Sequence, residues 1–142
     1  MYQSDPQVMR IIDANLNRAG EGLRFLEELA RMVLNDPELT AGLKTLRHKL
    51  VINDTSFNRQ LLGSRNASGD VGIDIEVDGE EKGKGIAELL VANSRRAQES
   101  LRILEELAKI PGISDYLDSN KFKHARFELY TVEKQLMSRL QE

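Results

Sequence analysis

The sequence lacks cysteine and tryptophan, and it has only two histidines among its 142 residues. Without cysteine there are no disulfides and no thiolate chemistry, and two isolated histidines make a poor set for structural zinc. No apolar run approaches the roughly 18 residues that a membrane span needs. The first residues also lack the basic stretch and apolar stretch of a signal peptide. We therefore expect a cytoplasmic protein without a membrane partner.

The composition is that of a globular domain. Apolar residues make up 40% of the chain, charged residues 30%, and the net charge is -3. A general nucleic-acid binder would normally be basic, so nucleic acid is not the expected partner. Aromatic residues are only 5% of the chain, so the core should consist mostly of Leu, Ile, Val and Ala. The length predicts a single helical domain over residues 1–142.

An internal repeat organises the chain. Residues 11–30 align without gaps on residues 89–108, at an offset of 78, and twelve of the twenty positions are identical. Two copies indicate a duplication and not a solenoid. We set the repeats at 8–62 and 86–141, with a connecting loop at 63–85.

In each repeat the apolar residues follow the three-and-four spacing of one helix face. The first long helix should end near Asn35, and Asp36 can cap a second helix with Pro37 in its first turn. Leucines at that spacing mark the second helix, which we expect to continue through Phe57 to Gly63.

The second repeat has the same plan. A long helix is predicted from Ile86 to Lys109, Pro111-Gly112 breaks it, and a final helix follows with Ser119 as its cap. Short connections make the helices of each pair antiparallel neighbours. The sequence therefore predicts an all-α fold, a four-helix bundle of two duplicated helix hairpins related by a pseudo-twofold axis.

The connecting loop holds six of the ten glycines. A connection this long in a compact domain is usually functional or disordered. Within it Val71, Ile73, Ile75 and Val77 alternate with Gly and acidic residues, which is the period of a short strand. Such a strand needs a partner, so it either lies on the bundle or pairs with its copy in a dimer. The sequence leaves this choice open, as it leaves the oligomeric state.

Four polar residues repeat in both copies, from an asparagine inside the apolar arc to an arginine on the far side of the helix. They are Asn15 and Asn93, Arg18 and Arg96, Glu21 and Glu99, and Arg24 and Arg102. One interpretation is a structural network between the long helices. The other is an anion site, because Arg can clamp a phosphate through two parallel hydrogen bonds while Asn orients an adjacent group. Small Gly22 and its equivalent Ser100 favour close helix packing, and the repeated pairs Glu27-Glu28 and Glu105-Glu106 are expected to be solvated.

Further candidates lie outside the repeated segment. Asp70 is flanked by glycines that would let the backbone approach a phosphate, and its carboxylate could hold Mg²⁺; the alternative is a turn before a strand. Arg65 and the pair Arg47-His48 are additional substrate-binding candidates. Neither the P-loop frame nor GxGxxG is present, so any nucleotide site would be unfamiliar.

Residues 10–31, 43–50, 68–76 and 91–109 together resemble a family of small helical proteins tied to thiamine biosynthesis. Its domain also occurs at the N-terminus of some long-form thiamine phosphate synthases. The most specific part is the duplicated Asn-x-x-Arg-Ala-x-Glu-x-Leu-Arg pattern with the intervening Gly-Asp-Val-Gly. Gly20, inside a predicted helix, departs from what a helix prefers, and the chain carries no synthase barrel.

The resemblance implies a non-canonical, MgATP-dependent kinase that converts hydroxymethylpyrimidine monophosphate to the diphosphate. On that hypothesis we assign catalysis to Arg18, Arg96, Glu21 and Glu99. We assign substrate binding to Asn15, Asn93, Arg24, Arg102, Arg47, His48 and Arg65, and Mg²⁺ to Asp70. The alternative is a non-catalytic docking or dimerisation module, or a ligand-binding accessory domain of a thiamine phosphate synthase. A homodimer and a synthase are the protein partners left open, and so is the repeat that carries the site.

Overall fold

The computed structural model describes residues 5–77 and 85–141, and in this part of the chain all regular structure is helical. The α-helices are α1 (Pro6–Glu28), α2 (Pro37–Lys49), α3 (Thr55–Gly63), α4 (Ile86–Leu107) and α5 (Ser119–Leu140). A wider π-helical turn, Leu29–Val33, extends α1, and a short 3-10 turn, Ile113–Asp115, precedes α5. The expected all-α class is confirmed.

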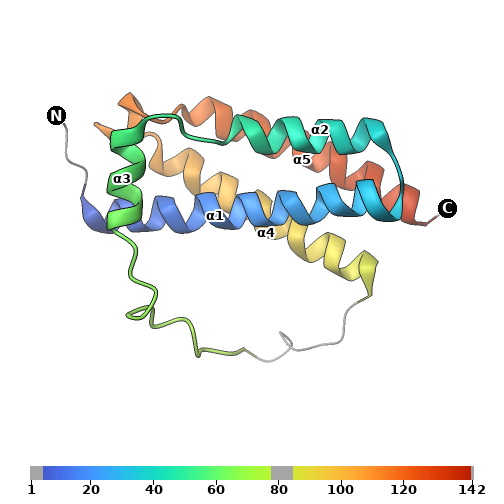
Figure 1. Ribbon diagram of the computed structural model, residues 1–142, viewed down its shortest axis with the longest axis horizontal. Coiled ribbons are helices and arrows are strands. Elements are labelled where there is room, and N and C mark those ends of the chain that lie inside the picture. The colour runs from blue at the N-terminus through green and yellow to red at the C-terminus, as the bar shows by residue number, and fades with distance from the viewer. Residues whose placement is uncertain (1–4, 78–84, 142) are drawn as a thin grey trace.

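Helices α1 and α4 form the centre of the fold. Helix α2 packs on α1, and α5 packs on α4 (Figure 1). Gly22 allows the central pair to approach closely, because a Cβ at this position would lie 2.9 Å from the carbonyl oxygen of Asn93 and 3.1 Å from the Cβ of Ala97. No larger residue fits there unless a helix moves.

The buried core is built mostly from leucine, as the composition predicts. Core side chains of the two central helices with no more than 1% exposure are Met9, Ile12, Ala19, Leu23, Leu26, Leu90, Ala97, Leu101 and Leu104. Beside α3, the ring of Phe57 stacks on that of Tyr116, with centroids 4.8 Å apart, and so fastens α3 to the turn before α5. None of the helices in the described ranges is long and apolar enough to cross a bilayer.

The prediction that the second helix of the first repeat continues through Phe57 to Gly63 is wrong. Helix α2 ends at Lys49, and α3 begins a new direction across one end of α1 (Figure 1). The carboxylate of Asp54 accepts a hydrogen bond of 2.9 Å from the amide of Phe57 and caps the new helix. Apolar spacing alone did not reveal the break, because Leu50 and Phe57 are buried on either side of it.

Helices α2 and α5 also begin at carboxylate caps. Asp36 accepts a hydrogen bond of 2.9 Å from the amide of Leu39 and caps α2, as expected. The cap of α5 is Asp118 and not Ser119, because the Asp118 carboxylate accepts the hydrogen bond from the amide of Asn120. An ionised carboxylate at this position also interacts favourably with the positive end of the helix dipole.

The long helix of the second repeat begins at Ile86 as expected and ends at Leu107, slightly before the expected Lys109. The chain then turns through Pro111-Gly112. Gly112 has a φ of 89°, a left-handed conformation that residues with a Cβ rarely adopt. The glycine therefore permits the tight reversal into α5.

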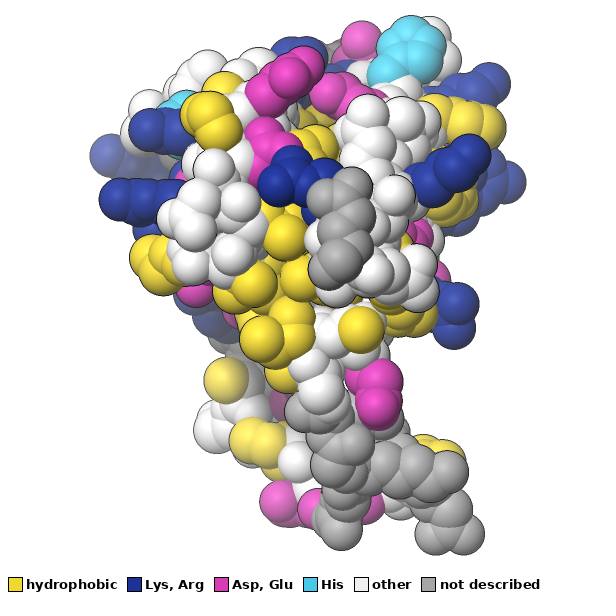
Figure 2. Space-filling model, turned by 90° about the vertical axis from the view of Figure 1, so that its right-hand side faces the viewer, with side chains coloured by type: hydrophobic (Ala, Val, Ile, Leu, Met, Phe, Trp, Pro, Cys, Tyr) yellow, Lys and Arg dark blue, Asp and Glu magenta, His cyan; other side chains and the backbone are white. Residues whose placement is uncertain are grey.

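The prediction of a short strand in the connecting loop is also wrong. Residues 71–77 lie in turns or irregular structure, and their apolar side chains are 62% to 87% exposed. Residues 71–77 extend away from the helices (Figure 1 and Figure 2). A strand needs a neighbouring strand, and the described part of the chain contains none. Residues 78–84, the remainder of the expected loop, lie outside the described ranges.

Candidate functional site

A groove opens on the first hairpin, between α1, the carboxyl-terminal end of α2, and α3. Its volume is about 740 Å³, which is within the range of about 300–1,000 Å³ that is usual for small-molecule sites. The chain between α2 and α3 forms one wall. The groove therefore depends on the break that ends α2. We call it the first-repeat groove.

Apolar and charged side chains share the lining of this groove. Leu16 of α1, Leu50 after α2 and Leu61 of α3 supply apolar surface. The charged lining residues are Asp13, Glu21, Arg24, Arg47 and Arg65. Such a lining suits an organic ring with charged substituents.

Asp13 and Arg65 form a two-point ion pair in the groove. Arg65 donates from Nε to one carboxylate oxygen and from Nη2 to the other, both at 2.9 Å. Asp13 is only 9% exposed, whereas the Arg65 side chain is 47% exposed. The hydrogen bonds to Asp13, and then the charge of its carboxylate, raise the pKa of Arg65. The carboxylate thus lies inside the protein and its partner faces solvent.

Arg47 and Arg24 surround a second carboxylate, that of Glu27. Arg47 Nε donates to Glu27 Oε1 at 3.0 Å. Arg24 Nη1 lies 4.0 Å from Glu27, and its Nε lies 3.6 Å from Glu28. The expectation that both glutamates are solvated is wrong for Glu27, which is 5% exposed. Arg47, a substrate-binding candidate, thus has a structural partner.

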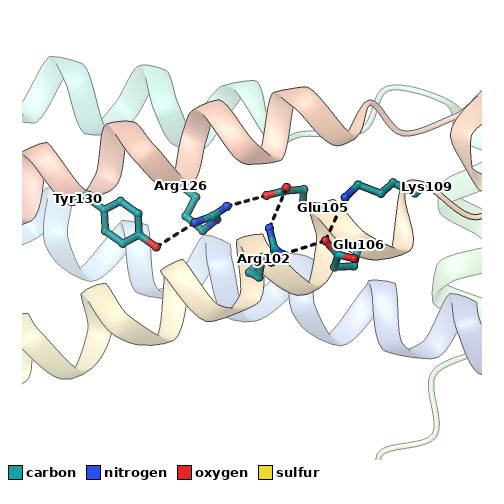
Figure 3. Close-up of polar contacts among 6 residues, drawn as sticks. All are labelled: Arg102, Glu105, Glu106, Lys109, Arg126 and Tyr130. Atoms are coloured by element: carbon teal, nitrogen blue, oxygen red, sulfur yellow. Dashed lines mark hydrogen bonds and ion pairs between the residues drawn. The ribbon is translucent and has the colours of Figure 1, made fainter.

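The second hairpin has a matching set of ion pairs (Figure 3). Arg126 of α5 donates to Glu105 Oε1 at 3.0 Å, and Arg102 donates to Glu105 Oε2 at 3.1 Å. Glu105 is buried at 5% exposure, so the expectation of a solvated pair fails here too. Arg102 Nη2 also lies 3.3 Å from Glu106, and a hydrogen bond from Lys109, followed by the charges of Lys109 and Arg102, lowers the pKa of Glu106. Arg102 is therefore part of a structural network.

Sequence reasoning missed Arg126. Its guanidinium lies 4.9 Å from the ring centroid of Phe127 and donates to the hydroxyl oxygen of Tyr130 at 3.1 Å. The hydrogen bond with Tyr130, then that with Glu105, raises the pKa of Arg126. The sequence did contain a signal for Arg126. It follows Ala125 on the apolar face of the final helix, and a cation buried there needs a carboxylate partner.

The four residues predicted to be catalytic do not converge on one point. Arg18, Glu21, Arg96 and Glu99 are all exposed. The structure brings two of them together: Arg96 Nη2 of α4 lies 3.8 Å from Glu21 Oε2 of α1. Glu21 is the member of this set that lines the first-repeat groove.

The two repeated asparagines bond to their own helices. Asn15 is 2% exposed and donates from Nδ2 to the carbonyl of Ile11 at 2.9 Å. Asn93 donates in the same way to the carbonyl of Leu89, also at 2.9 Å. The buried Oδ1 of Asn15 accepts no hydrogen bond from the described residues. Neither asparagine lines the groove.

His48 and Asp70 lie apart from the groove. His48 is exposed on α2. Asp70 is exposed on the connecting loop, where its Oδ1 accepts a hydrogen bond of 2.8 Å from the amide of Gly72. Within residues 5–77 and 85–141, no three His, Asp or Glu side chains cluster in a way that could hold a metal ion. The described residues therefore offer no ready-made cage for Mg²⁺.

Differences between the two repeats concentrate on the groove. Of the twenty aligned positions, twelve are identical and eight differ. Four of the differing positions line the groove, namely Asp13, Leu16, Asn17 and Gly20, with Val91, Ser94, Arg95 and Gln98 as counterparts. Gln98 donates to Glu133 of α5 at 2.6 Å, whereas a Cβ at Gly20 would meet nothing within 4 Å. The divergence thus follows the first-repeat groove.

Comparison with known proteins finds relatives of nearly the whole chain. Residues 10–135 match the model of the ThiD2 family. A thiamine-phosphate synthase of Rhodopirellula baltica is 50% identical over 103 residues, which are 72% of this chain and 28% of that protein. A thiamine-phosphate synthase of Nostoc punctiforme is 39% identical over 132 residues, which are 92% of this chain and 35% of that protein.

A third relative extends the match. A thiamine-phosphate synthase of Synechocystis sp. is 36% identical over 138 residues, which are 96% of this chain and 38% of that protein. This chain therefore spans about a third of the length of the curated relatives that it matches. No solved structure matches the chain at a significant level.

Proposed function

This chain belongs to the ThiD2 family, and on that premise we propose that it acts in thiamine biosynthesis and binds a phosphorylated pyrimidine in the first-repeat groove. The curated relatives named above, which are thiamine-phosphate synthases, support the pathway. The groove supports the site, because its lining combines apolar and charged side chains and includes four positions at which the two repeats differ. We interpret the four long helices as a bundle of two duplicated hairpins, of which the first gained the groove.

The activity that we propose is transfer of the γ-phosphoryl group of ATP to hydroxymethylpyrimidine monophosphate. A phosphate oxygen of the acceptor attacks the γ-phosphorus, a P–O–P bond forms, and ADP leaves. The attacking oxygen is already ionised near neutral pH, so no general base is required. The protein must supply positioning and positive charge. Arg24 and Arg65, each about half exposed, line the groove and can meet phosphate groups there.

The proposed cofactor is ATP with Mg²⁺. In phosphoryl-transfer proteins Mg²⁺ is commonly held by substrate phosphates and only one or two carboxylates, so the absence of a metal cage among the described residues is compatible with ion entry on ATP. Asp70 remains the proposed protein ligand from the sequence. It does not line the groove, and no step proposed above depends on it.

A second candidate function is a non-catalytic accessory domain of a thiamine-phosphate synthase. The comparisons favour it more directly than the kinase, because the matched relatives carry this name and about two thirds of each lies beyond the match. An accessory domain would bind the pyrimidine, or the synthase itself, without consuming ATP. The groove serves either function, so the reaction has to be measured.

The deciding experiment incubates the purified chain with ATP, Mg²⁺ and hydroxymethylpyrimidine monophosphate and follows ADP and the diphosphate by mass spectrometry. The kinase predicts diphosphate and ADP in equal amounts, only when both substrates are present. Binding of the monophosphate without turnover would support the accessory domain. Absence of both turnover and binding would reject the groove as a pyrimidine site.

Two glycine variants test whether the groove is the site. Gly20→Gln places the residue of the second repeat inside the groove and should abolish binding. Gly42→Gln is the matched control, because Gly42 is a helical glycine of α2 outside the groove and, as at Gly20, a Cβ there would meet nothing within 4 Å. Equal ligand affinity in both variants would place the ligand elsewhere.

A further inference from the structure

Asp13 is a buried carboxylate that helix packing does not require. Its equivalent in the second repeat is Val91, which is half-buried on α4. An apolar residue thus serves the same position of the helix in the other copy. Burying a carboxylate costs several kcal/mol unless a cation compensates it, so the charge at Asp13 calls for a role that Val91 lacks.

The compensating cation at Asp13 is placed where it can be exchanged. Arg65 follows the last residue of α3 by two positions, outside any helix. Its side chain is 47% exposed, whereas that of Asp13 is 12% exposed. Withdrawal of Arg65 would therefore move a guanidinium into water and leave both carboxylate oxygens facing the groove. The carboxylate cannot remain buried alone, so another cation must replace Arg65.

The geometry of the pair defines what that second cation must look like. Two N–H groups on one planar carbon meet the two oxygens of Asp13, each at 2.9 Å. A protonated amidine presents the same fork, and so does an aminopyrimidine protonated at the ring nitrogen next to its amino group. Leu16 and Leu61 offer apolar surface nearby, and Gly20 leaves open space for a flat ring.

We propose that Asp13 is the specificity residue of the first-repeat groove, and that it exchanges Arg65 for the protonated amidine edge of a ring ligand. This inference rests on the proposed pyrimidine ligand for its physiological meaning. One cation replaces another, so the buried carboxylate stays compensated throughout. The released guanidinium of Arg65 remains in the groove and can pair with the phosphate of the same ligand. The pair of Asp13 and Arg65 thereby recognises both the ring edge and the phosphate of an aminopyrimidine phosphate.

Titration calorimetry of the full chain with 4-amino-2-methyl-5-hydroxymethylpyrimidine monophosphate tests the exchange. Above the pKa of the free ring, the ligand must take a proton from the buffer to bind, so titrations in buffers of different ionisation enthalpy should show uptake of about one proton. The analogue with a 4-oxo group in place of the amino group should bind about tenfold to a hundredfold more weakly, because it presents an acceptor to the carboxylate.

Asp13→Asn should remove both the proton uptake and the preference for the amino compound over the oxo analogue, while keeping the shape of the side chain. An amide turns one donor group and one acceptor group toward the ligand edge, so it suits the neutral aminopyrimidine and the oxo analogue alike. The variant should take up no proton and bind both compounds with similar affinity. Asp36→Asn is the matched control, since Asp36 pairs with Arg139 outside the groove. Unchanged proton uptake and unchanged discrimination in Asp13→Asn would overturn the inference and leave the proposed function standing.

Benzamidine separates failure of the inference from failure of the proposed function. Arg65→Ala removes the resident cation, so benzamidine, an amidine that is protonated at neutral pH, should bind that variant and not the Asp13→Asn, Arg65→Ala double variant. If benzamidine binds the Arg65→Ala variant and not the double variant, but the pyrimidine phosphate does not bind the natural chain, the exchange site stands and the proposed function fails. If benzamidine does not distinguish the two variants, Asp13 is not an exchange site.

Discussion

Replacing Gly22 by alanine should destabilise the fold by forcing its two central helices apart. The added Cβ would lie 2.9 Å from the carbonyl oxygen of Asn93 and 3.1 Å from the Cβ of Ala97. The first atom belongs to the backbone of α4 and the second is bonded directly to it, so neither can turn away by side-chain rotation. The helices must shift where α1 and α4 pack together.

Two terms of opposite sign set the magnitude. Alanine improves the helix propensity of a glycine site by about 1 kcal/mol, whereas overpacking of a close contact costs about 1–3 kcal/mol. Gly20→Ala is the matched control on the same helix, because its Cβ would meet nothing within 4 Å. Only the favourable term applies there, so Gly20→Ala should stabilise the chain by about 0.5–1 kcal/mol.

Urea denaturation measures both variants on one scale. The propensity term cancels between them, so their free energies of unfolding should differ by about 1–3 kcal/mol, the packing term alone. The slope with urea should stay constant if only the native contact has changed. Equal midpoints for Gly22→Ala and Gly20→Ala would refute the close approach of α1 and α4.

The charged residues give two further predictions. Arg126→Ala should lower the free energy of unfolding by about 2 kcal/mol, because the buried Glu105 then keeps only the exposed Arg102 as a partner. Adding Glu105→Gln should recover part of the loss in urea denaturation, and no recovery would show that the buried carboxylate does not cause it. The amide of Leu39, and then the charge of Arg139, lower the pKa of Asp36, so its ionised form stabilises the fold at neutral pH and this contribution disappears as the pH falls through the lowered pKa. Thermal unfolding should therefore show Asp36→Asn less stable than the natural chain at about pH 7, with a difference that shrinks steadily as the pH falls below about 4, whereas a constant difference would contradict the assignment.

The sequence predicted those parts of the fold that adjacent residues encode. The three-and-four spacing of apolar residues identified both central helices. Asp36 and Pro37 marked the start of α2, and the structure has the cap there. Gly22, read as a packing residue, lies at the closest approach of α1 and α4. Each of these features depends on residues within a few turns of one helix, so the linear pattern contains the information.

The candidate site was only partly predictable. Arg24, Arg47, Arg65 and Glu21 were named from the sequence and do line the groove. Asp13 was not named as a site residue from the sequence, because its partner lies 52 residues away. The paired roles of Arg47 and Arg126 were missed for the same reason, since an ion pair across two helices depends on how they pack.

The sequence by itself determined the helical class, the duplicated central helices and the family, because helix periodicity, capping residues and the internal repeat are properties of neighbouring residues. Only the tertiary structure decided that α2 ends before Asp54, that α3 crosses the end of α1, and that a groove results. It also decided that Asp13 meets Arg65 and that Glu27 is buried. These outcomes depend on helix directions, which many weak contacts set together and no local pattern records.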